Sequence, residues 1–216
     1  MDGQPLEDLA AVRARLPRRL GGRLCLDFVN TVDPRHGDHA REYLRGYDDL
    51  VAWARVTGTL DDREAGRLLQ RATSLPAEAA AVLDRAVALR EALYRVFAHP
   101  PPPDPGGLEV VNREVGRALG QTCLRPATGA ARYRLGWAEA GPTLDRPLWP
   151  VARSAAELLA SPDADRVREC QGDGCGWLFL DTSRNRRRAW CSMDGCGNRA
   201  KARRHYARRR TGEAAP

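Results

Sequence analysis

Cys170-Gln171-Gly172-Asp173-Gly174-Cys175 and Cys191-Ser192-Met193-Asp194-Gly195-Cys196 are the two stretches that decide the fold of the C-terminal part of this chain. Each cysteine pair encloses four residues, and fifteen residues separate the two pairs. The enclosed residues are rich in Gly and other turn formers, which lets the backbone wrap around an ion. Four thiolates complete the tetrahedral shell of Zn²⁺ and leave no open position for chemistry. The spacing predicts one structural zinc ion per chain, held by Cys170, Cys175, Cys191 and Cys196.

Disulfides, unpaired buried thiols and an iron–sulfur cluster are the alternatives for these cysteines. Disulfides need an oxidising compartment, and the acidic, polar start of the chain at residues 1–5 does not resemble a secretory signal. No apolar run approaches the length of about eighteen residues that a membrane span needs. We therefore expect a cytoplasmic protein without a membrane segment. Its finger is expected to need zinc to fold, since metal binding contributes about 10–16 kcal/mol in finger peptides.

The residues around the cysteines suggest a compact layout. Residues 176–180 and 187–190 read as two short strands joined by a turn at 181–186. Residues 198–210 lack Gly and Pro and are rich in Ala and Arg, which favours a helix. Loop, hairpin, loop and helix around one ion form a treble-clef-like zinc finger with four cysteine ligands. Trp177 and Trp190 adjoin the ligands, and we expect them to pack around the zinc rather than stack on bases.

Positive charge is concentrated in this C-terminal part. The whole chain carries +7, whereas residues 166–210 hold thirteen Arg or Lys against four Asp or Glu, which is +9; the remainder therefore sums to 7 − 9 = −2. Lysine occurs once, at Lys201, so we argue from where the cations cluster and not from their being Arg. A small, strongly cationic module predicts a polyanionic partner.

Two groups of residues are predicted to contact nucleic acid: the tip of the finger hairpin, where the arginines have no apolar neighbour, and the final helix. At about 100° per residue, the helix places Lys201, Arg204 and Arg208 in one sector and Arg199, Arg203 and Arg210 in another. Ala202 and Tyr206 are expected to dock the helix on the hairpin. The full set of predicted contacts is Arg184, Asn185, Arg186, Arg187, Arg188, Arg199, Lys201, Arg203, Arg204 and Arg208.

Residues 1–165 are expected to form a predominantly α-helical domain with a small β-hairpin, and residues 166–216 a separate finger, giving an α+β protein overall. A stiff polyproline connector is expected at 99–105, and Thr59 with Asp62 is expected to cap the helix that follows. Residues 24–32 fit both a strand and a helix, with a slight preference for the helix. Helices are predicted before Pro17 and at 24–32, 48–56, 60–73, 76–98, 105–119 and 147–160, and hairpin strands at 121–125 and 131–137.

Some residues of this helical domain are candidates for function. Asp27 and Asn30 lie in an apolar stretch and either line a pocket or, as we prefer, act as a cap or internal brace. Residues 33–39 bring two His and two Asp together, which reads better as a solvated loop than as a second metal site. Val82, Ala86 and Leu89 begin an apolar stripe that suits either the core or a dimer seam.

The finger residues carry a family resemblance. The run Cys175-Gly176-Trp177-Leu178-Phe179-Leu180-Asp181-Thr182-Ser183, followed by Trp190-Cys191-Ser192-Met193 and Cys196-Gly197-Asn198-Arg199-Ala200-Lys201, resembles the CGNR zinc finger. That finger closes a group of bacterial proteins regarded as stress-induced transcription regulators. Leu24-Cys25-Leu26-Asp27-Phe28-Val29-Asn30-Thr31-Val32 is similar to the opening motif of the ABATE domain, which usually precedes this finger. The resemblance implies DNA binding and transcriptional control.

Three function classes follow from these observations. The leading one is a DNA-binding transcription regulator whose helical domain senses an unidentified effector or dimerises; we expect a homodimer, because one small finger binds weakly alone. The second is an RNA-binding or ribosome-associated zinc protein, because charge alone does not distinguish A-form from B-form backbones. The third, an enzyme, is not expected, since the chain lacks a G-x-S-x-G motif, a phosphate-binding loop and a zincin helix.

Overall fold

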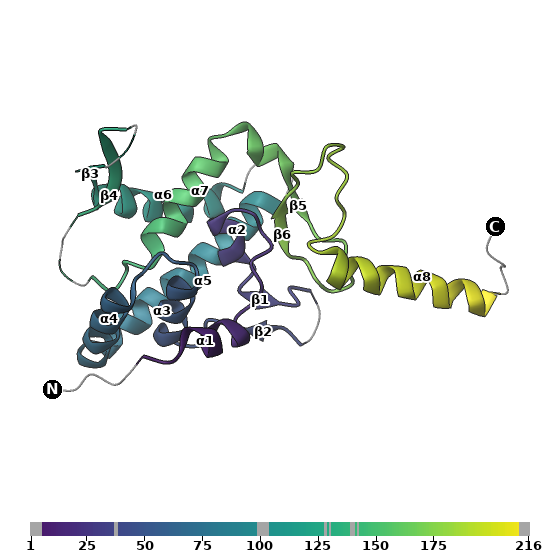
Figure 1. Cartoon of the computed structure of the whole chain (residues 1–216), viewed down its shortest axis with the longest axis horizontal. Helices are drawn as coiled ribbons and strands as arrows, with labels where there is room; N and C mark the ends of the chain where they lie inside the picture. Colours follow the sequence, from purple (N-terminus) through teal and green to yellow (C-terminus); the bar gives the residue numbers. More distant parts are fainter. Residues whose placement is uncertain are drawn as a thin grey trace.

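The structure is a computed structural model that describes residues 6–36, 39–98, 104–127, 129, 131–138, 141 and 143–211. α-Helices dominate it, and short antiparallel strand pairs join them (Figure 1), as the predicted α+β class requires. The helices are α1 (Leu9–Arg15), α2 (Leu24–Val29), α3 (Tyr47–Val56), α4 (Asp62–Ser74), α5 (Pro76–Ala98), α6 (Pro105–Gly120), α7 (Leu148–Leu159) and α8 (Asn198–Thr211). The strand pairs are β1 (Val32–Asp33) with β2 (Arg41–Glu42), β3 (Thr122–Pro126) with β4 (Tyr133–Trp137), and β5 (Val167–Glu169) with β6 (Leu178–Leu180).

Helix α5 lies at the centre of the molecule, where it contacts α2, α3, α4, α6 and both strands of the β5–β6 pair. The apolar stripe predicted for it is buried: Val82 is 6% exposed, and Ala86, Leu89 and Leu93 are fully enclosed. Burial of such side chains stabilises the fold by about 1.5–3 kcal/mol each for the larger ones. The stripe is therefore core and is not available as a dimer seam.

The segment that the sequence left ambiguous, residues 24–32, is divided between two elements. Helix α2 ends at Val29, and Val32 opens strand β1. The helix lies in the core, because Cys25, Leu26, Phe28 and Val29 are all fully enclosed. The ring of Phe28 meets that of Trp53 on α3 edge to face, with 5.2 Å between centroids.

Two local predictions need correction or fall outside the described residues. The capping box of α4 is made by Asp61 and Glu64 and not by Thr59 and Asp62: the Asp61 carboxylate accepts from Glu64 N at 2.7 Å, and Asp61 N donates to the Glu64 carboxylate at 3.1 Å. Thr59 instead donates its hydroxyl to the carbonyl of Ala54 at the end of α3. The predicted polyproline connector falls largely on residues 99–103, which lie outside the described residues.

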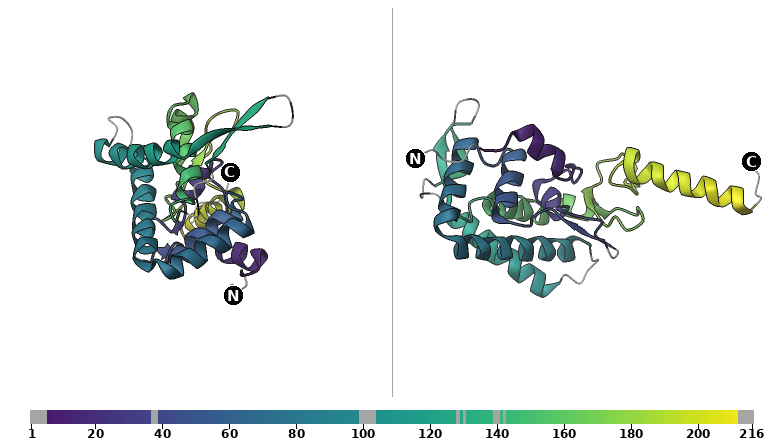
Figure 2. Two further views of the ribbon diagram at one scale, coloured as in Figure 1. Left: turned by 90° about the vertical axis from the view of Figure 1, so that its left-hand side faces the viewer. Right: turned by 90° about the horizontal axis from the view of Figure 1, so that it is seen from below.

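The β3–β4 hairpin forms as predicted, with Leu124 opposite Leu135 in its register. It projects from the helical body at the end of the long axis that is opposite α8 (Figures 1 and 2). Both leucines are exposed, at 69% and 49%. This part of the chain thus presents apolar side chains to solvent, whereas the finger presents cations.

The predicted hairpin within the finger is wrong in its pairing. Residues 178–180 form strand β6 as expected, but their partner is β5 on the N-terminal side of the first cysteine. Residues 187–190 form no strand, because other groups engage their backbone: Arg188 N donates to the Asp181 carboxylate, and Ala189 O accepts from Gln171 N at 2.9 Å. The finger thus consists of the β5–β6 ribbon, two cysteine loops and α8.

This ribbon belongs to the core of the helical domain. Val167, Leu178 and Leu180 are at most 7% exposed and pack in the same apolar cluster as α2, α3 and α5. The domain boundary predicted near residue 165 stays a prediction. The β5–β6 ribbon packs directly against the helices as part of their core.

Candidate zinc centre and nucleic-acid interface

The four predicted ligands converge on one point from three pieces of the chain. Cys170 follows β5 directly, Cys175 precedes β6, Cys191 precedes the π-helical turn η2 (Met193–Gly197), and Cys196 lies within that turn, which leads into α8. Their sulfur atoms all lie within 4.8 Å of one another, and all four side chains are buried. In the described part of the chain, no other cluster of three or more His, Cys, Asp or Glu side chains is close enough to hold a metal.

The spacing of the sulfurs matches zinc. Cys175 Sγ lies 3.9 Å from Cys191 Sγ, which lies 3.8 Å from Cys196 Sγ. A tetrahedron with Zn–S bonds of about 2.3 Å places its sulfurs about 3.8 Å apart, whereas a disulfide requires about 2 Å. The loop also fits an enclosed ion, because a Cβ on Gly172 would lie 2.7 Å from Cys196 Sγ. The four cysteines therefore fit one structural zinc ion.

Hydrogen-bond donors around the sulfurs are arranged for thiolates. Cys170 Sγ accepts from Gly172 N at 3.4 Å and from Cys191 N at 3.2 Å. Cys196 Sγ accepts from Arg199 Nη2 at 3.1 Å. These donors offset part of the negative charge that four thiolates bring to one Zn²⁺.

Without a cation, sulfurs this close cannot all ionise. Hydrogen bonding with Cys175 and Cys191 lowers the pKa of Cys170. Hydrogen bonding with Cys170 raises the pKa values of Cys191 and Cys175. Zinc binding would release the protons that these thiols retain without metal. Metal affinity would therefore fall as the pH is lowered.

A second set of contacts fixes the metal loops to the helical domain. Arg35 N donates to Cys175 O and His36 N donates to Gly174 O, both at 2.9 Å. Gly174 and Gly176 have φ values of +68° and +64°, which side-chain-bearing residues rarely adopt. A Cβ on Gly176 would also meet the His36 ring at 2.7 Å. These glycines let the segment at 35–36 lie against the first cysteine loop.

Asn30 is the internal brace that the sequence suggested. Its side chain is fully buried, and its amide pairs with both backbone groups of Leu178 on β6. Trp177 adds a further bond by donating Nε1 to Val32 O at 3.0 Å. Asn30 therefore joins the end of α2 to the finger.

Asp27 also acts as a brace. Its Oδ1 accepts from Gly21 N at 2.8 Å, and burial raises the pKa of the carboxyl group. Backbone groups of this chain engage both Asp27 and Asn30, which favours the brace, and the alternative that they line a pocket stays a prediction. In the described part of the loop at 33–39, His36 Nε2 lies 2.7 Å from the Glu169 carboxylate and 3.1 Å from Tyr94 Oη.

The tip of the finger, residues 182–187, is exposed and is organised by Asp181. This fully buried carboxylate accepts from Ser183 N at 2.9 Å and from Arg188 N at 3.0 Å. Burial favours its neutral form, but these hydrogen bonds outweigh burial and lower its pKa. The surface of the tip has an open depression of about 620 Å³, which is lined by Ser183, Arg184, Asn185, Arg187 and Arg188.

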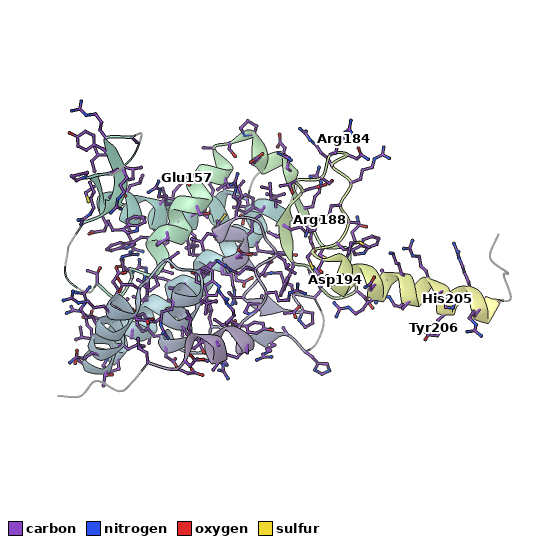
Figure 3. All side chains as sticks on the ribbon, in the orientation of Figure 1. Glu157, Arg184, Arg188, Asp194, His205 and Tyr206 are labelled. Carbon is purple, nitrogen blue, oxygen red and sulfur yellow. The ribbon has the colours of Figure 1, made fainter. Side chains whose placement is uncertain are left out.

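Arg188 differs from the other tip arginines. Its guanidinium lies 4.4 Å from the centroid of the Phe179 ring, and it donates to the carbonyls of Trp190 and Cys191. The prediction that it lacks an apolar neighbour is wrong, because β6 turns Phe179 toward it. Figure 3 shows Arg184 at the far end of the tip and Arg188 closer to the start of α8. Arg184, Asn185, Arg186 and Arg187 are exposed.

Helix α8 forms where the sequence predicted it but docks differently. It extends away from the body (Figures 1 and 2), and all side chains from Lys201 to Arg209 are exposed. Tyr206 is 65% exposed, and Figure 3 shows it with His205 on the projecting part of the helix. The prediction that Ala202 and Tyr206 dock α8 on the finger is therefore wrong.

The two cationic sectors of α8 have different surroundings. Arg199 contacts the sulfur of Cys196, and Arg203 pairs with Asp173 of the first cysteine loop at 2.7 Å. This sector therefore faces the zinc centre. Lys201, Arg204 and Arg208 lie about 140–200° around the helix from Arg199 and present their charge on the opposite side.

The sequence reading missed the supports of this site. Arg35 places its guanidinium 4.0 Å from the Tyr94 ring centroid, pairs with Glu91 at 2.8 Å and donates to Val29 O. It thereby ties the segment beside the metal loop to α5. The sequence did not single out Arg35, because arginine is abundant throughout the chain. Asp181 carried a clearer signal, since an Asp with a Ser two residues later, directly after a strand, is typical of an Asx turn.

The fold and the site together define a class of protein: a helical domain into which a four-cysteine zinc finger is integrated. The model of the ABATE family, described as "putative stress-induced transcription regulator", matches residues 22–162, and the CGNR zinc finger model matches residues 166–209. The chain belongs to the ABATE family and ends in a CGNR zinc finger, as the resemblance indicated. No curated protein matches the chain. Within the described residues, no helix is both long and apolar enough to cross a membrane.

Proposed function

We propose that this protein is a cytoplasmic, signal- or stress-responsive transcription regulator that binds duplex DNA through its finger. One observation carries the proposal: the exposed tip and the outward sector of α8 hold cations without acidic residues among them. Residues 182–190 and 198–211 contain no Asp or Glu, and Arg184, Arg186, Arg187, Lys201, Arg204 and Arg208 are exposed. Like charges at this density repel one another, and a polyanion reverses that cost.

The shape of α8 supports a duplex partner. A helix of fourteen residues is about 21 Å long and about 10–12 Å wide with its side chains. The major groove of B-DNA is about 12 Å wide and admits such a helix, whereas the major groove of A-form RNA is too narrow. In the proposed arrangement α8 lies in or along the major groove and the tip contacts the adjacent phosphates.

Zinc has a positioning role in this proposal and takes part in no reaction. The ion would hold the η2 turn, and therefore the start of α8, at a fixed distance from the β5–β6 ribbon. The tip is connected to the same ribbon through Asp181. The helix and the tip would thus meet a duplex in one orientation, which lowers the entropy lost on binding. The proposal includes no enzymatic activity, and substrate turnover in a broad hydrolase screen would contradict that part.

A homodimer is part of the proposal, because two fingers bound to one operator gain affinity through effective concentration. The α5 stripe is buried and cannot serve as its interface. The exposed leucines of the β3–β4 hairpin, Leu124 and Leu135, offer an apolar surface of the kind that self-association covers. Sedimentation analysis at micromolar concentration tests the homodimer. We expect the wild type to be a dimer and the Leu124→Glu variant to be a monomer. A monomeric wild type would contradict this part of the proposal.

Binding of labelled 30-base-pair DNA and of the same sequence as duplex RNA, measured by fluorescence anisotropy, tests the nucleic-acid partner. The test variant replaces Arg184, Arg187 and Lys201 by Gln. Its matched control replaces Arg13, Arg113 and Arg153, three arginines of the helical domain, and loses the same charge. We expect at least tenfold weaker DNA binding for the finger variant only. Equal loss in both variants, or a preference for RNA, would contradict a DNA-reading finger.

Genome-wide footprinting tests the regulatory role. The tagged wild type is expected to occupy discrete chromosomal sites, and the Cys191→Ser variant to lose them. Cys123→Ser, which removes a thiol outside the metal centre, is the matched control. Site-specific occupancy by the Cys191→Ser variant would show that the zinc-ordered finger does not read the DNA.

A further inference from the structure

A second site lies in the helical body, away from the finger. A cavity of about 850 Å³ opens between α4, the β3–β4 hairpin and the start of α7. These elements lie toward the end of the molecule that is opposite α8 (Figure 1). The volume falls in the range of about 300–1,000 Å³ that small-molecule sites occupy. Neither the zinc centre nor the proposed nucleic-acid contacts use any residue of this cavity.

Arg146 and two tryptophans form one wall of the cavity. The guanidinium carbon of Arg146 lies 5.5 Å from the ring centroids of both Trp137 and Trp149. The two rings are tilted at 50° with their centroids 5.7 Å apart. Arg146 is therefore held by aromatic faces and not by a strong ion pair: its contact with the Glu64 carboxylate is 3.3 Å long, and Glu64 is already engaged in capping α4.

Two buried donors on this wall have no acceptor among the described residues. They are Arg146 Nη1 and Trp149 Nε1, and the Trp149 side chain is only 3% exposed. A buried donor without a partner is destabilising, so such groups are rare unless a ligand or ordered water completes them. Both residues line the same cavity, so one acceptor-rich ligand could satisfy both.

The charge of the cavity defines the sign of that ligand. Among the described residues that line it, Arg63, Arg67, Arg134 and Arg146 outnumber the carboxylates of Asp61 and Glu64, for a balance of 4 − 2 = +2. The chain outside residues 166–210 carries a net charge of −2. The positive balance is therefore local to the cavity and does not follow the charge of the surrounding domain.

We propose that this cavity binds a small organic anion that carries a carboxylate on an aromatic ring. The carboxylate would accept from Arg146 Nη1 and Trp149 Nε1, and the ring would lie against Trp137 and Leu68. Aromatic rings pack well against indole faces, and a planar guanidinium suits a planar carboxylate. The proposal concerns the helical body only, so it stands or fails independently of nucleic-acid binding.

Titration calorimetry of the zinc-loaded, full-length protein with 1-naphthoate tests the ligand class. We expect saturable binding of one molecule per chain, with a Kd of about 1 mM or tighter for a ligand of this size. The neutral 1-naphthamide, acetate and inorganic phosphate separate the two halves of the ligand and are each expected to bind at least tenfold more weakly. Equal binding of the neutral amide would overturn the carboxylate contact, and equal binding of phosphate the aromatic one.

Variants identify the site. Arg146→Gln is expected to lower the affinity for 1-naphthoate at least tenfold, whereas Arg153→Gln, which changes a half-buried arginine of α7 outside the cavity, leaves it unchanged. Trp149→Phe retains an aromatic ring but removes the indole N–H. It provides a second test of the same site if Arg146→Gln does not fold. In the wild type, the indole N–H resonance that Trp149→Phe removes is expected to shift downfield with 1-naphthoate. Wild-type affinity in both variants, or an unmoved resonance, would refute the proposal.

Discussion

The side chain of Asn30, directly after α2, pairs with the backbone of Leu178 on β6: Asn30 Nδ2 donates to the Leu178 carbonyl at 2.8 Å, and Asn30 Oδ1 accepts from the Leu178 amide at 2.9 Å. Both residues are fully buried. One side chain thereby satisfies two backbone groups of the finger ribbon from within the helical core. The finger and the helical body are consequently one structural unit at this point.

Replacing Asn30 by Ala is expected to lower the free energy of unfolding by roughly 2–4 kcal/mol, because it leaves a buried N–H and a buried carbonyl without partners. Urea denaturation followed by circular dichroism measures this change. Asn112→Ala, on the exposed face of α6, is the control and is expected to stay within about 0.5 kcal/mol of wild type. A stability of Asn30→Ala close to wild type would show that water or a shifted backbone replaces the amide.

Removing zinc is expected to weaken the helical body as well as the finger. Loss of the ion frees the cysteine loops, and the ribbon residues Val167, Leu178 and Leu180 then lose packing worth on the order of 1.5–3 kcal/mol each. We expect a chelator to lower the melting temperature of the whole protein, and Cys191→Ser to lower it without a chelator. An unchanged melting temperature of the α-helical signal after chelation would mean that the ribbon stays docked without metal.

Thiol reactivity distinguishes the six cysteines. In the zinc-bound protein one thiol, that of half-buried Cys123, is expected to react rapidly with a disulfide reagent, since the four ligands are buried. Burial raises the pKa of Cys25 to about 11, which suppresses its thiolate. Chelation is expected to release four more reactive thiols, and only denaturant the sixth. Five fast thiols before chelation would show that the cysteines hold no metal.

Arg186 and Arg184 separate charge from backbone conformation at the tip. Arg186 has a φ of +49°, a left-handed conformation that costs about 1–2 kcal/mol for residues other than Gly. Arg186→Gly is therefore expected to stabilise the protein slightly while weakening DNA binding. Arg184→Gly removes the same charge without relieving this cost, so it is expected to weaken binding equally but to lower stability. Equal stability changes in the two variants would argue against the left-handed turn.

The salt dependence of DNA binding counts the cations that engage phosphates. Six exposed cations on the tip and the outward sector of α8 give a slope of log K against log salt no steeper than about −5, at about −0.9 per contact on duplex DNA. Anisotropy titrations between low and moderate salt measure this slope. Removing Arg187 is expected to reduce its magnitude by about 0.9. A slope near zero would exclude phosphate contacts as the basis of binding.

Local signals predicted much of this structure. Helical periodicity and the Gly and Pro positions located α5, α6 and α7 closely, and the β3–β4 hairpin followed from its turn and alternating residues. The cysteine spacing identified the metal centre, because four soft ligands at short intervals have few other uses. In each case neighbouring residues in the chain carry the signal.

Apart from the capping box of α4, which is displaced by two residues from the predicted pair, the errors concern contacts between distant residues. The partner of β6 is β5, which lies before the first cysteine, and no local pattern distinguishes it from residues 187–190. Arg188 resembles its neighbours Arg186 and Arg187 in sequence, and only the position of Phe179 in the fold gives it a different role. The prediction that Tyr206 packs on the finger rests on its position beside the Arg199 and Arg203 sector of the helix, but α8 extends away from the body and leaves Tyr206 exposed. Long-range placement, rather than propensity, decides such residues.

Helix α8 has one further consequence. An isolated helix of fourteen residues is marginal in water, and the like charges along it oppose its formation. Added salt screens that repulsion and so stabilises the helical conformation of α8. The cations of the salt also compete with those of the protein for the DNA phosphates. The two influences act in opposite directions on affinity, so cooling, which favours the helix, should strengthen DNA binding most when ionic strength is lowest.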